Sequence, residues 1–304
     1  MQSFINRAGW VLAAALGVFV VAALAGVVRG GPLDPPGAPG PTLPQVQPRS
    51  PIPPVGWNGT FPIVLSQPGS YFLTRNIDMS TPGNAIEISS NDVSLDLNGF
   101  RVDGHGSGTE GIAVTSTINN LRVHNGIVRG WSTGISATFS NTAFAQGGDF
   151  EDLQISGNSH GGIRADSGSV IRHVTVEANT DWGIYLSDAG NAYYGGLIED
   201  SVVTRNGIGV EVNANNVTLR RCVIDSSING GVTVAGAFDV VTDNTIQGTN
   251  FGAGVTLTGS SNTVARNIFA NVAGGAVQNL GSGNRIGPLD GTLAGTQPWS
   301  NAGP

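Results

Sequence analysis

Short segments in which apolar and polar residues alternate recur along the chain from residue 84 onward. In GVEVNA (209–214) and GVTLTG (254–259) the alternation has a period of two, which is typical of β-strands. β-branched residues dominate these segments, and Gly, Asn and Asp occupy the positions between them, where turns need them. The pattern therefore predicts strands joined by tight turns.

The segments return at a nearly constant interval. Their first apolar residues lie 21 to 28 residues apart, and most follow a glycine: Ile86, Ile112, Ile135, Ile163, Ile184, Val210, Val232 and Val255. A repeating unit of this length is typical of a solenoid. We therefore expect each unit to form one coil, with its apolar residues stacked on those of the coils on either side.

Each unit also contains a second extended run that is interrupted by one polar residue. These residues are Asn98, Asn125, Asp152, His173, Asp200, Arg221, Asp243 and Arg266. We expect them in a tight turn between two short strands, where Asn and Asp tolerate a left-handed backbone. Parallel stacking about 4.8 Å per coil then predicts an all-β fold, a right-handed single-stranded parallel β-helix of about nine coils.

Four phrases carry a resemblance to a known family: LSQPGSYFLTRNI (65–77), VSLDLNGFRVDG (93–104), GNRIGP (283–288) and PWSN (298–301). The sequence resembles right-handed parallel β-helix repeat proteins of the pectate-lyase-like superfold. It is most similar to exported bacterial β-helix repeat proteins of unassigned activity. The resemblance covers about residues 60–301 and implies the fold, but it implies no particular reaction.

Three regions are expected along the chain. Residues 1–28 contain Arg7 followed by an uncharged apolar run, typical of a signal peptide or a membrane anchor helix, and Ala23-Leu24-Ala25 favours cleavage. Residues 29–56 form a Pro-rich linker, and 57–301 form the β-helix domain. We therefore expect a secreted, periplasmic or cell-surface bacterial protein, which contacts a membrane only through an uncleaved N-terminal segment.

Composition and charge exclude some functions. The formal net charge is −7 and the chain has no lysine, which disfavours nucleic acid as a partner and excludes lysine chemistry. Cys222 is the single cysteine, lies in an apolar column and is expected in the core. Capping of the solenoid ends is expected from Tyr71, Phe72 and Leu73 at one end and from Trp299 at the other.

Candidate functional residues gather on the first strand of three consecutive units. Strand alternation places Arg164, Asp166, Tyr185, Glu211 and Asn213 on the outer face, whereas the flanking units carry Ala113, Ser136, Thr233 and Thr256 there. Asp188 follows its strand directly, and Trp182 lies in the turn before the same strand, where it could wall the same patch. Asp166 and Glu211 are the candidate catalytic carboxylates for acid–base chemistry on a glycan. The candidate ligand-binding residues are Arg164, which could orient a sugar carboxylate, and Trp182, Tyr185, Asp188 and Asn213. The alternative is an ordinary solvated surface with cross-strand polar pairs.

No metal site or cofactor is predicted. A calcium site would need several carboxylates converging on one ion, and alternation directs neighbouring acids such as Glu199 and Asp200 to opposite faces, so calcium has no support in the sequence. The scattered histidines His105, His124, His160 and His173 are expected in turns or on the surface.

Three functions are consistent with these features. The first is recognition of a carbohydrate or cell-surface polymer along one sheet face without turnover. The second is a polysaccharide lyase or glycoside hydrolase acting on an extracellular glycan. The third is a non-catalytic structural or adhesive rod. The sequence names neither the ligand nor the oligomeric state.

Overall fold

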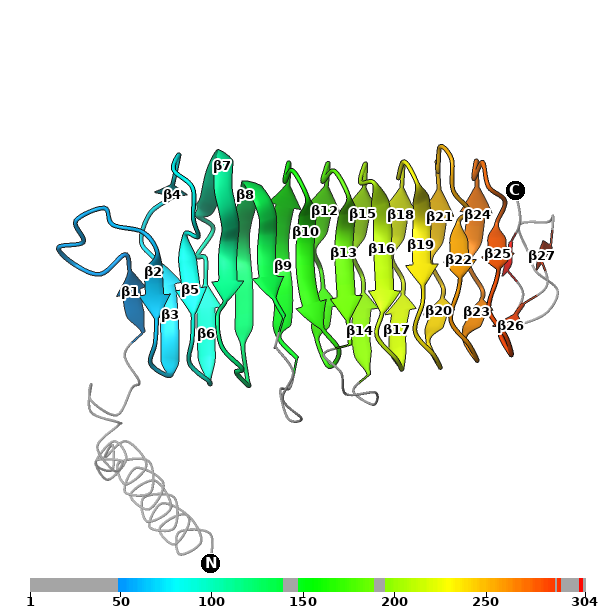
Figure 1. Ribbon diagram of the computed structural model, residues 1–304, viewed down its shortest axis with the longest axis horizontal. Coiled ribbons are helices and arrows are strands. Elements are labelled where there is room, and N and C mark those ends of the chain that lie inside the picture. The colour runs from blue at the N-terminus through cyan, green and yellow to red at the C-terminus, as the bar shows by residue number, and fades with distance from the viewer. Residues whose placement is uncertain (1–48, 139–146, 189–194, 288, 291–300, 303–304) are drawn as a thin grey trace, which may run out of the picture. The chain divides into compact units, whose positions relative to one another are not determined.

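The computed structural model describes residues 49–138, 147–188, 195–287, 289–290 and 301–302. The expected signal or anchor segment, most of the expected linker and Trp299 lie outside the described residues. No helix within the described ranges is long and apolar enough to cross a membrane. The described residues instead form parallel strands that wind into a single solenoid (Figure 1).

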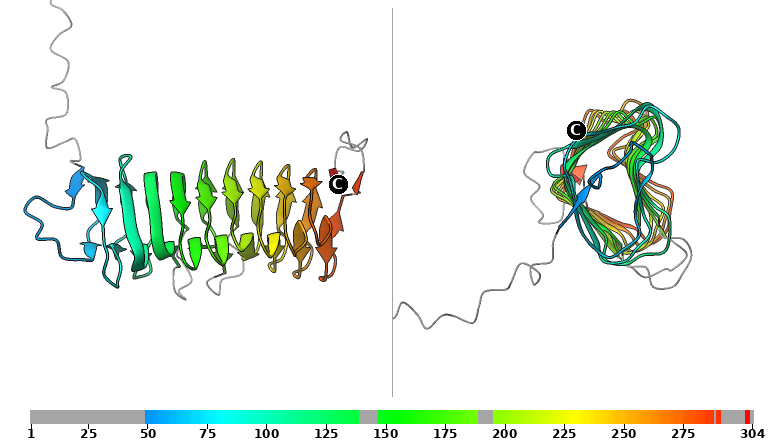
Figure 2. Two further views of the ribbon diagram at one scale, coloured as in Figure 1. Left: turned by 90° about the horizontal axis from the view of Figure 1, so that it is seen from above. Right: turned by 90° about the vertical axis from the view of Figure 1, so that its left-hand side faces the viewer.

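Three parallel ladders make up the solenoid, which encloses an elongated core when it is viewed along its axis (Figure 2). We call them sheets A, B and C. Strands β7 (Arg101–Val114), β8 (Arg122–Ala137) and β9 (Asp149–Ser156) are long enough to continue from one sheet into the next.

Sheet A contains parts of β7 and β8 together with β2 (Ile63–Leu65), β5 (Ile86–Ile88), β10 (Gly161–Asp166), β13 (Trp182–Ser187), β16 (Ile208–Asn213), β19 (Gly230–Val234), β22 (Val255–Leu257) and β25 (Val277–Asn279). Sheet B contains parts of β8 and β9 together with β1 (Ser50–Ile52), β3 (Gly69–Leu73), β6 (Val93–Asp96), β11 (Val170–Arg172), β14 (Gly196–Glu199), β17 (Val217–Arg220), β20 (Val240–Thr242), β23 (Thr263–Ala265) and β26 (Arg285–Ile286).

Sheet C contains parts of β7, β8 and β9 together with β4 (Ile77–Asp78), β12 (Thr175–Glu177), β15 (Val202–Thr204), β18 (Val223–Asp225), β21 (Thr245–Gln247), β24 (Ile268–Ala270) and β28 (Asn301–Ala302). The short strand β27 (Leu289–Asp290) pairs with β28.

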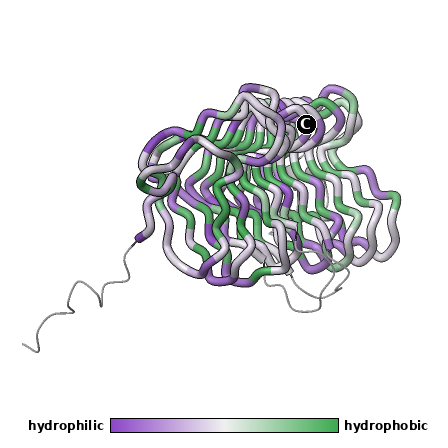
Figure 3. The backbone as a smooth tube through the Cα atoms, turned by 60° about the vertical axis from the view of Figure 1, so that its left-hand side comes forward, coloured by the Kyte–Doolittle hydropathy of each residue, from purple (hydrophilic) through white to green (hydrophobic). Residues whose placement is uncertain are grey.

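The apolar residues that defined the repeat occupy one column of sheet A. All eight of them, from Ile86 to Val255, pair in register with their counterparts in the next coil and are fully buried. Hydrophobic positions recur at the same place in successive turns (Figure 3). The predicted fold class is therefore confirmed. Within the described residues ten strands pair in sheet A rather than nine, because β2, which precedes the first predicted unit, adds a coil.

A column of glycines precedes this apolar column and explains why most units begin with Gly. In Gly183, for example, an added Cβ would lie 2.7 Å from the Gly209 carbonyl oxygen and 2.7 Å from Val203 Cγ1 in the core. The glycine and the apolar residue after it therefore both face inward, which interrupts the alternation. As a result, the residue before each glycine, such as Trp182, lies on the outer side of sheet A.

The predicted turn column is also confirmed. All eight residues from Asn98 to Arg266 have a positive φ, between 50° and 62°. They lie where the chain passes from sheet B to sheet C, between two strands in most coils and within the continuous strands β8 and β9 for Asn125 and Asp152. Even His173, Arg221 and Arg266 adopt this conformation, which shows that the stack imposes it on residues that rarely take it alone.

Polar ladders run inside the corners. Buried Asn158, Asn179 and Asn206 are linked by bonds in which the Asn158 side chain donates to Asn179 Oδ1 at 2.8 Å, and Asn179 to Asn206 Oδ1 at 2.9 Å. Such ladders satisfy backbone groups at the turns, which would otherwise be buried without partners. Cys222 is buried as predicted, and burial raises the pKa of its thiol to about 12.

The β-helix begins earlier in the chain than residue 57, where its start was expected. Ser50–Ile52, within the expected linker, form β1 and pair with Tyr71, Phe72 and Leu73 of β3. Leu73 is fully buried, while Tyr71 and Phe72 are partly exposed. The three residues expected as the cap are thus covered in turn by one further strand.

Candidate functional site

The outer side of sheet A is hollowed over β8, β10 and β13. The hollow has a volume of about 290 Å³ and is lined by Thr133, His160, Arg164, Trp182 and Tyr185. Arg164 and Tyr185 are outward residues of adjacent strands and pair in register. Gly161 forms the floor under Trp182, because a Cβ there would lie 2.1 Å from the indole ring. The absence of a side chain at Gly161 therefore leaves room for the Trp182 ring.

Aromatic and cationic groups pack closely around this hollow, which we call the aromatic hollow. The rings of Trp182 and Tyr185 have centroids 5.5 Å apart, and His160 meets Trp182 edge-on at the same distance. The Arg164 guanidinium lies 5.8 Å from the centre of the Tyr185 ring. Trp182 is only 8% exposed and so is rigidly held, whereas Arg164 is exposed. The arrangement combines fixed ring faces with an accessible positive charge.

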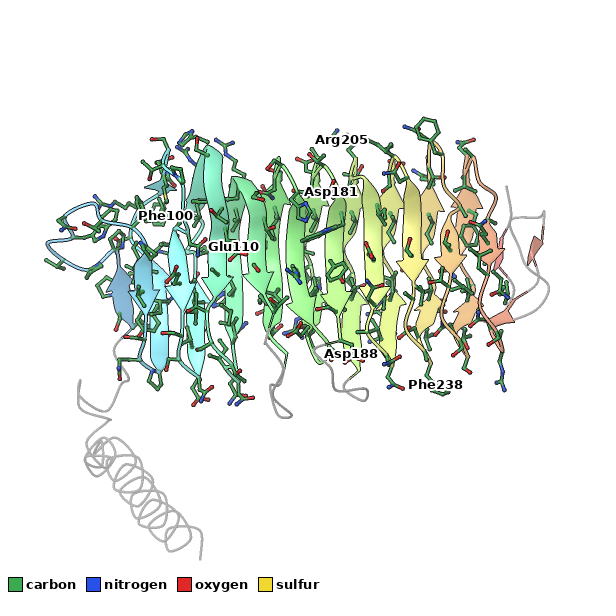
Figure 4. All side chains as sticks on the ribbon, in the orientation of Figure 1. Phe100, Glu110, Asp181, Asp188, Arg205 and Phe238 are labelled. Carbon is green, nitrogen blue, oxygen red and sulfur yellow. The ribbon has the colours of Figure 1, made fainter. Side chains whose placement is uncertain are left out.

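A carboxyl group lies beside the hollow on the preceding strand. Glu110 of β7 pairs in register with Thr133, and Ser136 donates a hydrogen bond to its carboxylate. Burial raises the pKa of Glu110 above its usual value, although the Ser136 hydrogen bond and the nearby Arg164 charge oppose this effect. Figure 4 labels Glu110 on β7, on the side of the solenoid where sheet A faces the viewer. It is thus a candidate acid of the kind that proton transfer uses.

A histidine–aspartate pair lies at the rim. His160 Nδ1 contacts Asp181 Oδ2, and both side chains are about half exposed. The carboxylate orients the imidazole and favours a proton on Nδ1, which leaves Nε2 available to a ligand. His160 was expected merely on the surface, and the structure places it at the hollow.

Three of the predicted site residues form a small network next to the hollow. The Asn213 amide donates to Tyr185 Oη at 3.0 Å and to Glu211 Oε1 at 3.1 Å. Glu211 pairs in register with Tyr185. The structure thus brings together Arg164, Trp182, Tyr185, Glu211 and Asn213 on the outer face of adjacent strands.

The other predicted residues lie toward the sheet B end of the same strands. Asp166 is only 4% exposed, and Ser187 Oγ donates to its Oδ1 at 2.8 Å. Asp188 accepts a hydrogen bond of 2.7 Å from the Asn215 amide. Figure 4 places Asp188 at the lower end of the strands, away from Glu110.

The two candidate catalytic carboxylates are not neighbours. Asp166 pairs with Ser187, and Glu211 pairs with Tyr185, so β13 separates them and they are offset by two residues along the strand. Standard strand geometry then puts their Cα atoms about 12 Å apart. Glu211 therefore lies in the same row as Arg164 and Tyr185, whereas Asp166 lies two residues nearer to sheet B.

One group among the described residues has the composition of a metal site. Asp78, Asp103 and His105 have ligand atoms within 4.8 Å of one another. Two arginines already contact these carboxylates, however: Arg101 Nη2 lies 2.8 Å from Asp78, and Arg129 Nε lies 2.7 Å from Asp103. These ion pairs compete with a cation, so the group does not fit a calcium centre, which needs several free carboxylates.

Sequence reasoning missed Glu110, Thr133 and His160. Glu110 and Thr133 precede the inward glycines Gly111 and Gly134, where the alternation is interrupted. A count of the residues before each Gly–Ile pair would have found this second outward column. His160 lies in a turn, and only the pairing of β10 with β13 brings it to Trp182.

Comparison with known proteins identifies the family. No curated protein sequence matches the chain. Two solved structures from Azotobacter vinelandii are similar: the A-module of mannuronan C-5 epimerase AlgE6 (14% identity, TM-score 0.46, 79% of this chain and 85% of that one) and the A-module of AlgE4 (12%, 0.42, 79% and 83%). The family model described as "Right handed beta helix region" matches residues 63–246 and 161–287. The chain therefore belongs to the right-handed β-helix family.

Proposed function

We propose that this protein is an exported β-helix protein that recognises a carbohydrate or cell-surface polymer along the outer face of sheet A, without turnover. The aromatic hollow is the observation that carries the proposal. Rigid rings of Trp182 and Tyr185 stand beside the polar groups of Arg164 and His160. Concave sites with aromatic walls and a few polar groups are typical of ligand binding, and flat rings provide apolar contact for sugars.

The direction of the sheet supports a linear ligand. Successive strands of sheet A follow one another at about 4.8 Å, so outward residues form rows along the solenoid axis. Arg164, Tyr185 and Glu211 occupy consecutive positions of one row. Asn213 and Asp188 extend the polar surface toward the sheet B side. A polymer lying along this row would contact several coils at once.

Binding of soluble polysaccharides to the purified protein tests this proposal. We expect retention of at least one glycan, weakened at least tenfold by Tyr185→Ala with an unchanged melting temperature. Phe238→Ala is the matched control, because this exposed aromatic residue lies at the sheet B edge (Figure 4). Retention of no glycan would contradict the proposal and favour the structural or adhesive rod, and equal loss in both variants would contradict the outer face of sheet A as the binding surface.

Export is the second half of the proposal and rests on the sequence of residues 1–28. Fractionation of the native bacterium and N-terminal sequencing of the recovered protein test it. Export with cleavage predicts a mature chain that begins after Ala25. A chain that retains Met1 in a membrane fraction would favour the anchor, and a cytoplasmic chain would contradict export.

A catalytic role as a polysaccharide lyase or glycoside hydrolase is the second candidate. The observation that favours it is Glu110, whose pKa is raised beside a hollow that also contains His160. Asp166 and Glu211 were the sequence candidates, and Glu110 is a further candidate because it pairs in register with Thr133, which lines the hollow. Release of reducing ends or unsaturated products would establish turnover. Loss of those products in Glu110→Gln, but not in Asp166→Asn, would assign the acid.

A further inference from the structure

The arginines of this chain divide into paired and unpaired groups. Of the twelve in the described residues, nine form ion pairs with carboxylates: Arg49, Arg101, Arg122, Arg129, Arg172, Arg205, Arg220, Arg221 and Arg266. The other three are Arg75, which lies over Trp57, Arg285 near the C-terminal end, and Arg164. In a protein of net charge −7, an arginine kept out of ion pairing inside a concave site is exceptional.

Arg164 is accessible and oriented. Its side chain is exposed and lies over the Tyr185 ring in the wall of the aromatic hollow. It forms no ion pair with any carboxylate of the described residues. Segments 139–146 and 189–194, which lie outside them, contain no Asp or Glu. A planar guanidinium held against an aromatic ring is well suited to bidentate recognition of a carboxylate.

Two acidic residues lie farther along the same outward row as Arg164. Glu87 lies three strands away on the N-terminal side, with Ser136 next to Arg164, and Glu211 lies two strands away on the C-terminal side. Glu110 is near enough for its charge to interact with Arg164, yet it bonds Ser136 instead. These carboxylates would repel a second anionic group of a ligand. A ligand with a negative charge on every sugar would place some of its charges against Glu87 or Glu211.

We propose that the aromatic hollow binds a sugar carrying an isolated carboxylate, with neutral sugars on either side, and that Arg164 is the carboxylate-binding residue. This inference rests on the proposed carbohydrate-binding function and adds the class of ligand. Trp182 and Tyr185 contact the sugar rings, Arg164 takes the carboxylate in a bidentate pair, and the acids along the row exclude homopolymers of acidic sugars.

The test compares three oligosaccharides of equal length by calorimetric titration of the purified protein. One carries a single glucuronic acid on a neutral xylose chain, the second is the same chain without the acid, and the third is an oligomer of galacturonic acid alone. We expect the singly acidic oligosaccharide to bind at least tenfold more tightly than either of the others. The advantage over the neutral chain should disappear in Arg164→Gln and decrease as salt is raised.

Arg266→Gln is the matched control, because Arg266 is an ion-paired arginine at the sheet B–sheet C turn near the C-terminal end. It should retain the wild-type preference. Equal binding of the acidic and neutral chains, tighter binding of the galacturonic acid oligomer, or a preference that survives Arg164→Gln would overturn the inference while the carbohydrate-binding function stands. Binding of none of the three, and of no glycan in the wider screen, would overturn both.

Discussion

Sheet A has the same interior along its length but two different outer surfaces. In the central strands, β7 to β16, and in the C-terminal strands, β19 to β25, the inward column contains Ile or Val after an inward glycine, with Ala276 in place of the glycine in the last strand. Outside, the central strands β10, β13 and β16 carry Arg164, Tyr185 and Glu211, whereas the C-terminal strands carry Thr233, Thr256 and Gln278 at the same row.

The difference separates two kinds of constraint. The interior repeats because each coil must fit between two others, and a change in one coil is felt by its neighbours. The outer row is free of that requirement, so its residues can vary without loss of the fold. The charged and aromatic residues that gather on the outer row of β10, β13 and β16 are therefore what the proposed function rests on, whereas the repeat itself accounts only for the fold.

Substitution of the inward column should have the largest effect, and the same effect in both regions. Ile184→Asp and Val232→Asp each place a charge in the core without a partner, which should cost several kcal/mol of unfolding free energy. Thr256→Asp on the outer row should change it by less than about 0.5 kcal/mol. Chemical denaturation measures all three, and similar values for Ile184→Asp and Thr256→Asp would refute the assignment of faces.

The glycine column should be the next most sensitive. An added Cβ at Gly183 or Gly231 would lie 2.7 Å and 2.5 Å from the carbonyl oxygen of the next coil. Either change to alanine should therefore destabilise the protein by about 1–3 kcal/mol through overpacking. Gly230→Ala is the matched control, since its nearest atom would be 3.6 Å away. If Gly230→Ala and Gly231→Ala melt at the same temperature, the explanation of the repeat glycines is wrong.

One coil of the C-terminal region departs from the regular interior. Asp239 occupies a ladder position where the next coil has Asn262, whose amide donates to the Gly236 carbonyl at 3.0 Å. Asp239 Oδ1 accepts the Val217 N–H at 2.7 Å, but its buried Oδ2 has no partner. Burial, opposed by the Val217 hydrogen bond, raises the pKa of Asp239 to about 7.

The pH dependence of stability follows from this shift. The protonated carboxyl is favoured in the folded state. Its contribution to the free energy of unfolding is therefore complete below the ordinary pKa of 3.8 and is lost as pH rises toward about 7. Above about pH 7 the contribution is absent. Asp239→Asn should remove this loss and be more stable than wild type by about 1–3 kcal/mol at about pH 8. Thermal denaturation across pH measures the difference, and parallel curves for the two proteins would contradict it.

The fold was predictable because its rules are periodic. Spacing alone located the inward column from Ile86 to Val255, and the polar residues from Asn98 to Arg266 marked the turns. Strand alternation also placed Arg164 and Tyr185 on one outer face, since both lie after the inward glycine and within a regular strand.

The candidate site was less predictable because it depends on irregular positions. Glu110 precedes Gly111, where two consecutive residues face inward, so simple alternation places it on the wrong side. His160 lies in a turn that reaches Trp182 only through stacking of coils. Asp166 was expected in solvent, but Ser187 from the next strand covers it. Alternation gives the face of a residue but not how its neighbours shield it.

The most direct test replaces one outer-row residue of the central strands with the residue that the C-terminal strands carry. It tests whether the outer face of the central strands is the binding site. Tyr185 and Thr233 belong to the same row, with Glu211 between them, so Tyr185→Thr gives the central coil the outer surface of a C-terminal one. The measurement is the affinity of the wild-type protein and this variant for the glycan retained in the screen, with melting temperatures determined in parallel. We predict at least tenfold weaker binding at an unchanged melting temperature. Wild-type affinity in the folded variant would contradict the claim that the outer face of the central coils is the binding site.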